Sequence, residues 1–146
     1  LTWKALQRTG NALDDQERAV CLRQYRHPAQ RRFVELPAGL LDEEGEAPLD
    51  VARRELREET ALEVEPVAFL GAWVDRYGEA PGAVHTLNLF WIVRAVSGEP
   101  VPADDVAELA WFPADALPAR EELAFTRVAD VVEAWRRDVR GRAGRS

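Results

Sequence analysis

The sequence predicts a single α/β domain in which strands and two helices form layers around a mixed sheet. Its 146 residues are enough to bury a hydrophobic core. Short strand-like runs occupy much of the chain, one helical pattern interrupts them near the middle, and a second follows them near the end. We expect residues 1–140 to form this domain and the basic residues 141–146 to form a frayed tail.

The first expected strand covers residues 17–26, because apolar residues occur on both of its alternating faces. Val20 and Leu22 fall on one face, and Ala19 and Cys21 fall on the other. Later strands are expected at residues 32–36, 64–74, 83–96 and 106–112, with a loop at 37–48 and a turn at 75–82, where turn-forming residues gather.

Two helices are predicted. The first covers residues 48–60 and has Pro48 in its first turn, where proline is tolerated. The second begins near Glu121 and has apolar residues at helical spacing, namely Phe125, Val128, Val132, Trp135 and Val139. We expect Trp73, Trp91, Trp111 and Trp135 to belong to the core, and His27 and His85 to be structural.

Charge and cysteine content narrow the function classes. The formal net charge is −7, which argues against a broad cationic surface for nucleic acid. Cys21 is the sole cysteine, which fits a reducing cytoplasm. Neither a membrane-spanning apolar run nor a signal peptide is recognisable, so we expect a cytoplasmic protein that does not enter a membrane.

The stretch RRELREETAL, residues 53–62, places three acids on one helix face. Glu55, Glu58 and Glu59 are spaced i, i+3 and i+4. The simplest interpretation is a solvated face on which Arg54 and Glu58 form an i, i+4 ion pair. However, the helix macrodipole disfavours acids near a helix C-terminus, so a divalent cation such as Mg²⁺ or Mn²⁺ would explain the cluster better.

The longer stretch LPAGLLDEEGEAPLDVARRELREETAL resembles the signature of the Nudix hydrolases. That signature is a glycine, a glutamate and then Arg-Glu-apolar-X-Glu-Glu-X-Gly-apolar, and its places are taken here by Gly39, Glu46, Arg54, Glu55, Leu56, Glu58, Glu59 and Leu62. The resemblance implies an α/β/α sandwich of the Nudix type with a mixed central sheet. It also implies a pyrophosphohydrolase that acts on phosphoanhydride bonds.

The chain departs from the signature at two places. One extra residue lies between Gly39 and Glu46, and Ala61 stands where the family has a glycine. A longer loop is readily tolerated. If the backbone at position 61 is left-handed, a Cβ there costs about 1–2 kcal/mol.

The resemblance implies roles for the signature residues. Glu55, Glu58 and Glu59 would bind Mg²⁺, with Mn²⁺ as the alternative, and the loop backbone at Gly39 would approach the metal. Arg54 would orient Glu55 by a charge-assisted hydrogen bond. Glu46 would have a lesser, structural role.

The general base varies in the family, so it is either a signature glutamate such as Glu58 or an acid from a later loop. We favour Asp105 among the later acids, because it directly precedes the strand that begins at Val106. The other candidates are Glu79, Asp104 and Glu108.

The pairing of RQYRHP with ELPAG is similar to the ADP-ribose pyrophosphatase branch of the family. It implies that Arg26 contacts a substrate phosphate, although a strand arginine at a sheet edge would look the same. Tyr77 stands where that branch often has a proline. It is either a base-stacking residue, as in dinucleoside polyphosphate hydrolases, or an aromatic covering the core.

These observations predict hydrolysis of a small nucleoside diphosphate linked to another group. ADP-ribose is the preferred substrate, with AMP and ribose 5-phosphate as products. The alternatives are dinucleoside polyphosphates, oxidised nucleoside triphosphates, or a non-enzymatic Nudix-like ligand sensor. No nucleic acid or membrane partner is expected, and the resemblance is compatible with a homodimer.

Overall fold

The computed structural model describes residues 3–14, 16, 18–26, 30–40, 45–77, 81–103, 106–123 and 126–145. These residues form one seven-stranded sheet, two α-helices and a short 3₁₀-helix, η2. The strands are β1 (Trp3–Leu13), β2 (Ala19–Arg26), β3 (Arg31–Glu35), β4 (Ala38–Leu40), β5 (Glu63–Tyr77), β6 (Val84–Ser97) and β7 (Glu108–Phe112). The helices are α1 (Pro48–Thr60), η2 (Arg120–Glu122) and α2 (Thr126–Ala143).

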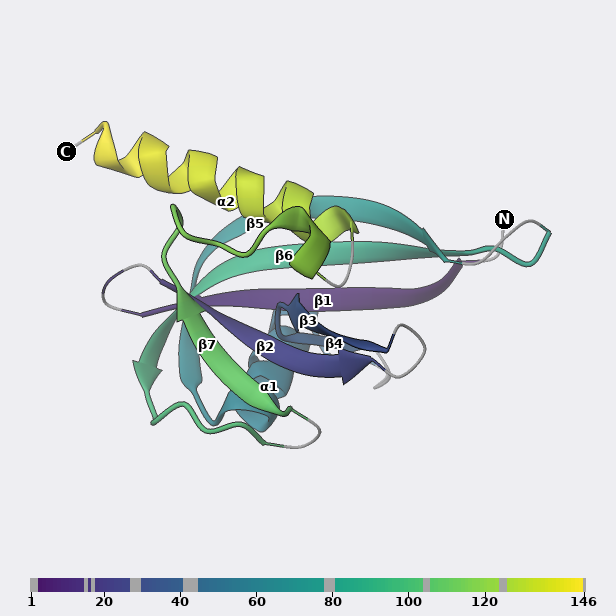
Figure 1. The fold of residues 1–146 in the computed structure, drawn as a ribbon, viewed down its shortest axis with the longest axis horizontal. Coiled ribbons are helices and arrows are strands. Elements are labelled where there is room, and N and C mark those ends of the chain that lie inside the picture. Colours follow the sequence, from purple (N-terminus) through teal and green to yellow (C-terminus); the bar gives the residue numbers. More distant parts are fainter. Residues whose placement is uncertain are drawn as a thin grey trace.

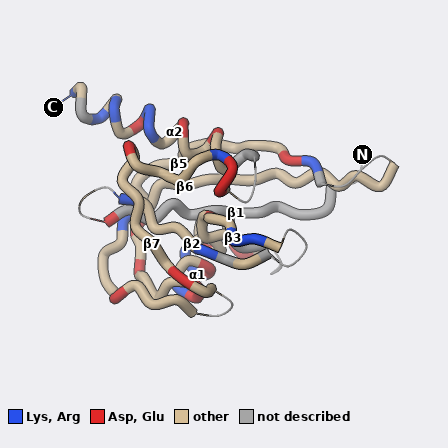
Figure 2. The backbone as a smooth tube through the Cα atoms, in the orientation of Figure 1, with Lys and Arg blue, Asp and Glu red and all other residues tan. Residues whose placement is uncertain are grey.

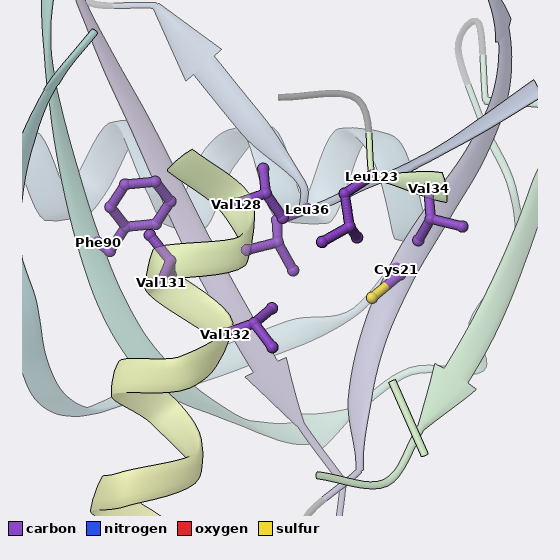
Figure 3. Close-up of a cluster of buried hydrophobic side chains, with 8 residues drawn as sticks. All are labelled: Cys21, Val34, Leu36, Phe90, Leu123, Val128, Val131 and Val132. Carbon is purple, nitrogen blue, oxygen red and sulfur yellow. The ribbon is translucent and has the colours of Figure 1, made fainter. Parts of the chain in front are cut away.

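The sheet is mixed. Its strand order is β3-β2-β1-β6-β5, with β4 paired to β1 and β7 paired to β2. Strands β1 and β6 are parallel, whereas the other pairs are antiparallel. The two α-helices lie on opposite faces of this sheet (Figures 1 and 3). The predicted α/β/α sandwich is therefore confirmed.

The core lies on both faces of the sheet. Helix α2 packs Val128, Val131 and Val132 onto one face in a cluster drawn in Figure 3, which also contains Cys21, Val34, Leu36, Phe90 and Leu123. On the other face, Leu56 of α1 belongs to a cluster with Val20, Leu62, Val64 and Val93. Alternate residues of β2 and β6 therefore serve opposite clusters, which fixes the register of both strands.

The tryptophans lie in this core to different extents. Trp135 of α2 is fully buried beside Ala19 and Ile92. Trp73, Trp91 and Trp111 are partly buried and pack against the core clusters. Trp73 also meets Phe90 edge-on, with ring centroids 5.3 Å apart.

Several elements differ from those expected. Helix α2 begins at Thr126 rather than near Glu121, and residues 120–122 form the separate 3₁₀-helix η2. Strand β1 was not predicted, and residues 38–40 form strand β4 inside a segment expected to be a loop. Strand β5 continues to Tyr77 through the start of the expected turn, and β7 begins at Glu108 rather than Val106. Strands β1 and β4 pair with each other. Neither sequence shows a clear strand pattern, so their strand conformation depends on this pairing.

Basic residues gather on the C-terminal half of α2 (Figure 2). They complement the negative end of the helix macrodipole, and Arg142 also forms an i, i+4 ion pair with Asp138 at 2.5 Å. Residues 141–143, assigned above to a basic tail, belong to this helix. Within the described residues, neither helix has the length and apolar content needed to span a bilayer.

The buried thiol offers a test of the core. Burial raises the pKa of Cys21 to about 12, whereas an exposed cysteine has a pKa of about 8.5. We therefore expect the native protein to resist a thiol-specific reagent at mildly alkaline pH and to react fully once unfolded by guanidinium. Rapid stoichiometric labelling without denaturant, measured by mass spectrometry, would contradict the packing of β2 against α2.

Candidate functional site

Helix α1 begins and ends at the predicted residues. Pro48 lies in its first turn, and Asp50 adds a negative charge near the positive end of the helix macrodipole. Val51, Ala52 and Leu56 are buried against the sheet. Because this apolar stripe must face the sheet, it determines the directions in which the acidic side chains of α1 point.

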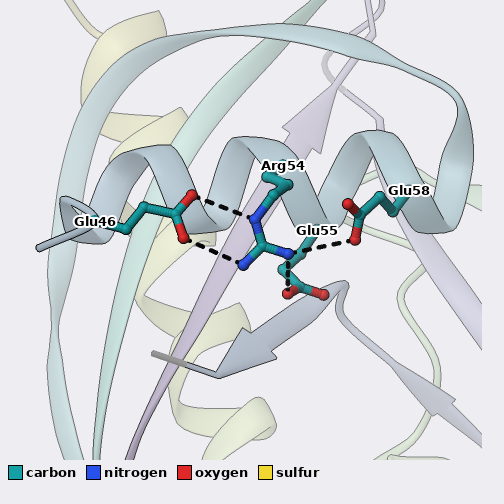
Figure 4. Close-up of polar contacts among 4 residues, drawn as sticks. All are labelled: Glu46, Arg54, Glu55 and Glu58. Carbon is teal, nitrogen blue, oxygen red and sulfur yellow. Dashed lines mark hydrogen bonds and ion pairs between the residues drawn. The ribbon is translucent and has the colours of Figure 1, made fainter. Parts of the chain in front are cut away.

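Arg54 holds the acids together (Figure 4). Its Nε and Nη2 donate to the two carboxylate oxygens of Glu46 at 3.3 and 3.2 Å. Its Nη1 donates to Glu55 at 2.9 Å and to Glu58 at 3.4 Å. One guanidinium therefore bridges Glu46, which lies two residues before the helix, and two carboxylates on the helix. The bond to Glu55 is the one expected of an orienting arginine.

The electrostatics of Arg54 follow from these contacts. The hydrogen bonds with Glu46 raise the pKa of Arg54 above its usual range, and the charges of Glu55, Glu46 and Glu58 raise it further. Arg54 therefore stays charged at any pH at which the protein is folded. Because two nitrogens of Arg54 bond the two oxygens of Glu46, this contact is a fork-to-fork anchor for the arginine.

The acids differ in their exposure. The side chain of Glu58 is 52% exposed, whereas that of Glu55 is 20% exposed. Glu59 is partly buried, and its Oε2 is shielded from solvent. The i, i+4 pair of Arg54 and Glu58 fits a solvated face, but such a face would leave both carboxylate oxygens of Glu59 in contact with water. A purely solvated face therefore does not account for Glu59.

The C-terminal end of α1 has a left-handed cap. Ala61 has φ 60° and ψ 13°, and its N–H donates to the Arg57 carbonyl at 2.8 Å. The condition set by the sequence analysis is met, because this is the backbone region that favours glycine. Thr60 is fully buried; its hydroxyl donates to the Leu56 carbonyl and accepts the Leu62 N–H.

The loop side of the site is formed by β4, which contacts α1. Gly39 lies in this strand opposite Arg8 of β1. This contact places β4, the strand that contains Gly39, beside the acidic helix.

Other predicted residues lie on other elements or outside the described residues. Tyr77 is the last residue of the 15-residue strand β5. Arg26 is the last residue of β2. Glu108 forms an exposed ion pair with Arg23 at 2.9 Å. The remaining candidate bases, Asp105, Asp104 and Glu79, lie outside the described residues.

Two buried polar residues received no role in the predictions from the sequence. Glu35 is buried in β3 at 7% exposure; its sequence signal is an acid that follows Phe33 and Val34 and begins ELPAG. Thr60 is buried at the end of α1. In the sequence it is recognisable as a hydroxyl residue at the last position of a helix, where its side chain can donate to a carbonyl of the preceding turn.

The acids suit a divalent metal by type, since Mg²⁺ and Mn²⁺ prefer carboxylate oxygens. Across the described part of the chain, no group of three or more His, Cys, Asp or Glu side chains converges as a metal site. The contacts of Arg54 explain this, because they draw Glu55 and Glu58 toward the guanidinium. A bound cation would compete with Arg54 for these oxygens.

Comparison with known families identifies this arrangement. Residues 8–133 match the model of the NUDIX domain, which covers most of the chain and all of the acidic helix. The chain therefore belongs to the NUDIX family, as the signature predicted. A MutT NUDIX hydrolase from Burkholderia pseudomallei has the same fold, with a TM-score of 0.69, 25% identity, and coverage of 89% of this chain and 96% of that one.

Two curated relatives match parts of the chain. The ADP-ribose pyrophosphatase of Mycobacterium tuberculosis is 54% identical over 52 residues, which are 36% of this chain and 25% of that protein. The methanol dehydrogenase activator of Bacillus methanolicus is 34% identical over 86 residues, which are 59% of this chain and 44% of that protein. The chain thus spans less than half the length of these relatives.

The cap of α1 predicts the effect of restoring the family residue. Glycine adopts the left-handed region without a Cβ penalty, so we expect Ala61→Gly to raise the free energy of unfolding by about 1 kcal/mol. Urea denaturation followed by circular dichroism measures this change. Ala134→Gly, the same substitution inside the right-handed helix α2, is the control and should lower the free energy of unfolding. A loss of stability in Ala61→Gly would contradict the cap geometry.

Proposed function

We propose that this Nudix domain hydrolyses the diphosphate bond of a nucleoside diphosphate linked to a second group. ADP-ribose is the preferred substrate, and AMP and ribose 5-phosphate are the products. The observation that carries this proposal is the set of carboxylates gathered by Arg54 on one face of α1. The ADP-ribose pyrophosphatase that shares 54% identity over 52 residues supports the choice of substrate.

The same acids are the proposed holders of a divalent metal, Mg²⁺ or Mn²⁺. Glu55, Glu58 and Glu59 would supply carboxylate oxygens, and the backbone of Gly39 would face the ion from β4. When bound, such an ion neutralises charge on the diphosphate and lowers the pKa of a water molecule. The shielded oxygen of Glu59 supports this assignment, because a buried carboxylate gains more from a cation than an exposed one.

The protein residues have separate proposed tasks. Glu46 anchors Arg54, and Arg54 holds Glu55 in place. Glu58 is exposed and bonded to Arg54 at the longest of the four distances, so it is the acid most able to turn toward substrate. The proposed general base is either Glu58 or Asp105; Asp105 follows Ala103 by two residues, and the Ala103 N–H donates to the Glu59 carbonyl at 3.2 Å.

Removing the charge of Glu58 tests the mechanism. We expect Glu58→Gln to lower kcat by about 100-fold or more, the size of effect that acid–base groups produce, because an amide neither accepts a proton nor binds Mg²⁺ well. Glu63→Gln is the matched control, since Glu63 is a comparably exposed acid paired with Arg57 just beyond the helix. Full activity of Glu58→Gln on every cleaved substrate would exclude this mechanism.

A substrate panel tests the specificity. With Mg²⁺ present, we expect ADP-ribose to be cleaved with a higher kcat/KM than dinucleoside polyphosphates, NADH or oxidised dGTP. Chromatographic identification of AMP and ribose 5-phosphate would support the proposal. Cleavage of triphosphates alone, with release of pyrophosphate, would identify a nucleotide-pool hydrolase instead. Binding of ADP-ribose without turnover would indicate a ligand sensor.

A further inference from the structure

The connection between β6 and β7 is tied to the end of helix α1. The Val101 N–H donates to the Thr60 carbonyl at 3.0 Å, and the Ala103 N–H donates to the Glu59 carbonyl at 3.2 Å. A third bond runs from the Val106 N–H to the Ala103 carbonyl at 3.1 Å. We refer to residues 98–103 as the clasp.

The clasp satisfies carbonyls that a helix cannot satisfy alone. The last four carbonyls of a helix have no partner within it. In α1 the Arg57 carbonyl accepts from Ala61, and the carbonyls of Glu59 and Thr60 accept from the clasp. The final turn is therefore held by backbone atoms that lie some forty positions later in the sequence.

The first residue of the clasp also packs against the helix cap. Gly98 has φ +98°, and a Cβ placed on it would lie 2.5 Å from the Ala61 carbonyl oxygen and 3.3 Å from the Leu62 Cα. Real Cβ atoms do not approach backbone so closely, so only glycine fits without a shift of one of the two segments. The close approach lies directly beside the left-handed cap at Ala61.

We propose that the clasp is a positioning element for the proposed catalytic carboxylates, acting through the backbone of the last turn of α1. Glu58 and Glu59 both lie in this turn, which in most helices frays. Donation from the clasp to the Glu59 and Thr60 carbonyls reduces the negative end of the helix dipole next to these acids. The inference rests on the proposed function for the roles of Glu58 and Glu59, but the contacts of the clasp do not depend on it.

Small displacements of such carboxylates have large effects. A misplacement of about 1 Å in a catalytic group lowers the rate by about 100-fold. A clasp that slips would therefore reduce kcat and the affinity for metal more than it reduces substrate affinity. If the clasp served stability alone, its disruption would lower the melting temperature and would change kcat, metal affinity and substrate affinity to the same extent.

The test compares two glycines that have positive φ and at which an added Cβ would lie within 3.0 Å of another residue. Gly98→Ala places a Cβ against the α1 cap, whereas Gly71→Ala, at φ +155° in β5, places a Cβ 2.8 Å from the Trp73 ring on the opposite face of the sheet. Three quantities are measured for each variant: kcat and KM for ADP-ribose with Mg²⁺, binding of Mn²⁺ alone by electron paramagnetic resonance, and amide hydrogen exchange of α1.

We expect Gly98→Ala to lower kcat by 10- to 100-fold, roughly, with KM changed less than threefold, to weaken Mn²⁺ binding, and to speed exchange in residues 56–60. Gly71→Ala should leave Mn²⁺ binding and α1 exchange as in the wild type. Equal effects of the two variants on all three quantities, or wild-type values in Gly98→Ala, would overturn the proposal.

A second variant covers the case in which Gly98→Ala does not fold. Ala103→Pro removes the N–H that donates to Glu59 and adds no bulk beside Ala61. Faster exchange at the end of α1 together with weaker Mn²⁺ binding supports the clasp, and unchanged values in both overturn it. If the wild type cleaves no substrate of the panel, the proposed function fails, while the exchange and Mn²⁺ measurements still decide the inference.

Discussion

A single guanidinium, that of Arg54, lies within ion-pair distance of three carboxylates, and the arrangement of the site depends on it. Two carboxylates about 5 Å apart repel each other by about 3 kcal/mol at an effective dielectric constant of about 20. A helix face with several acids would therefore spread its side chains apart if no cation lay among them. Arg54, which belongs to the same helix, offsets this repulsion. The acids therefore remain close together before any ligand binds.

The same arrangement explains how a metal would be accommodated. Arg54 is anchored by two bonds to Glu46, so it keeps its place if Glu55 or Glu58 turns away. The contact with Glu58 is the longest and the most exposed of the set, and breaking it costs little, about 0–1 kcal/mol. The site therefore combines a fixed pair, Arg54 and Glu46, with carboxylates whose present partner can be replaced by another cation.

The sequence predicted those parts of the molecule that depend on local patterns. Both bounds of α1 followed from Pro48 and from the helical spacing of its apolar residues, and the two faces of β2 followed from strict alternation. Strand β1 could not be predicted in this way, because its polar and apolar residues do not alternate and its place comes from parallel pairing with β6. The clasp left no pattern either, because its bonds to α1 come from backbone N–H groups that every residue except proline has.

Ala61 lies where the end of helix α1 meets the clasp. A left-handed alanine costs about 1–2 kcal/mol relative to glycine, yet the cap is retained in the described structure. Its own N–H bonds to Arg57, and the two carbonyls just before it accept from Val101 and Ala103. At about 1 kcal/mol for each net hydrogen bond, these three contacts are sufficient to offset the strain. The small residue that a close approach requires is then provided by the other segment, since Gly98 is the residue that lies against the Ala61 carbonyl. The geometry at the end of the acidic helix is thus set jointly by two segments distant in sequence, so a change in either one acts on the same carboxylates.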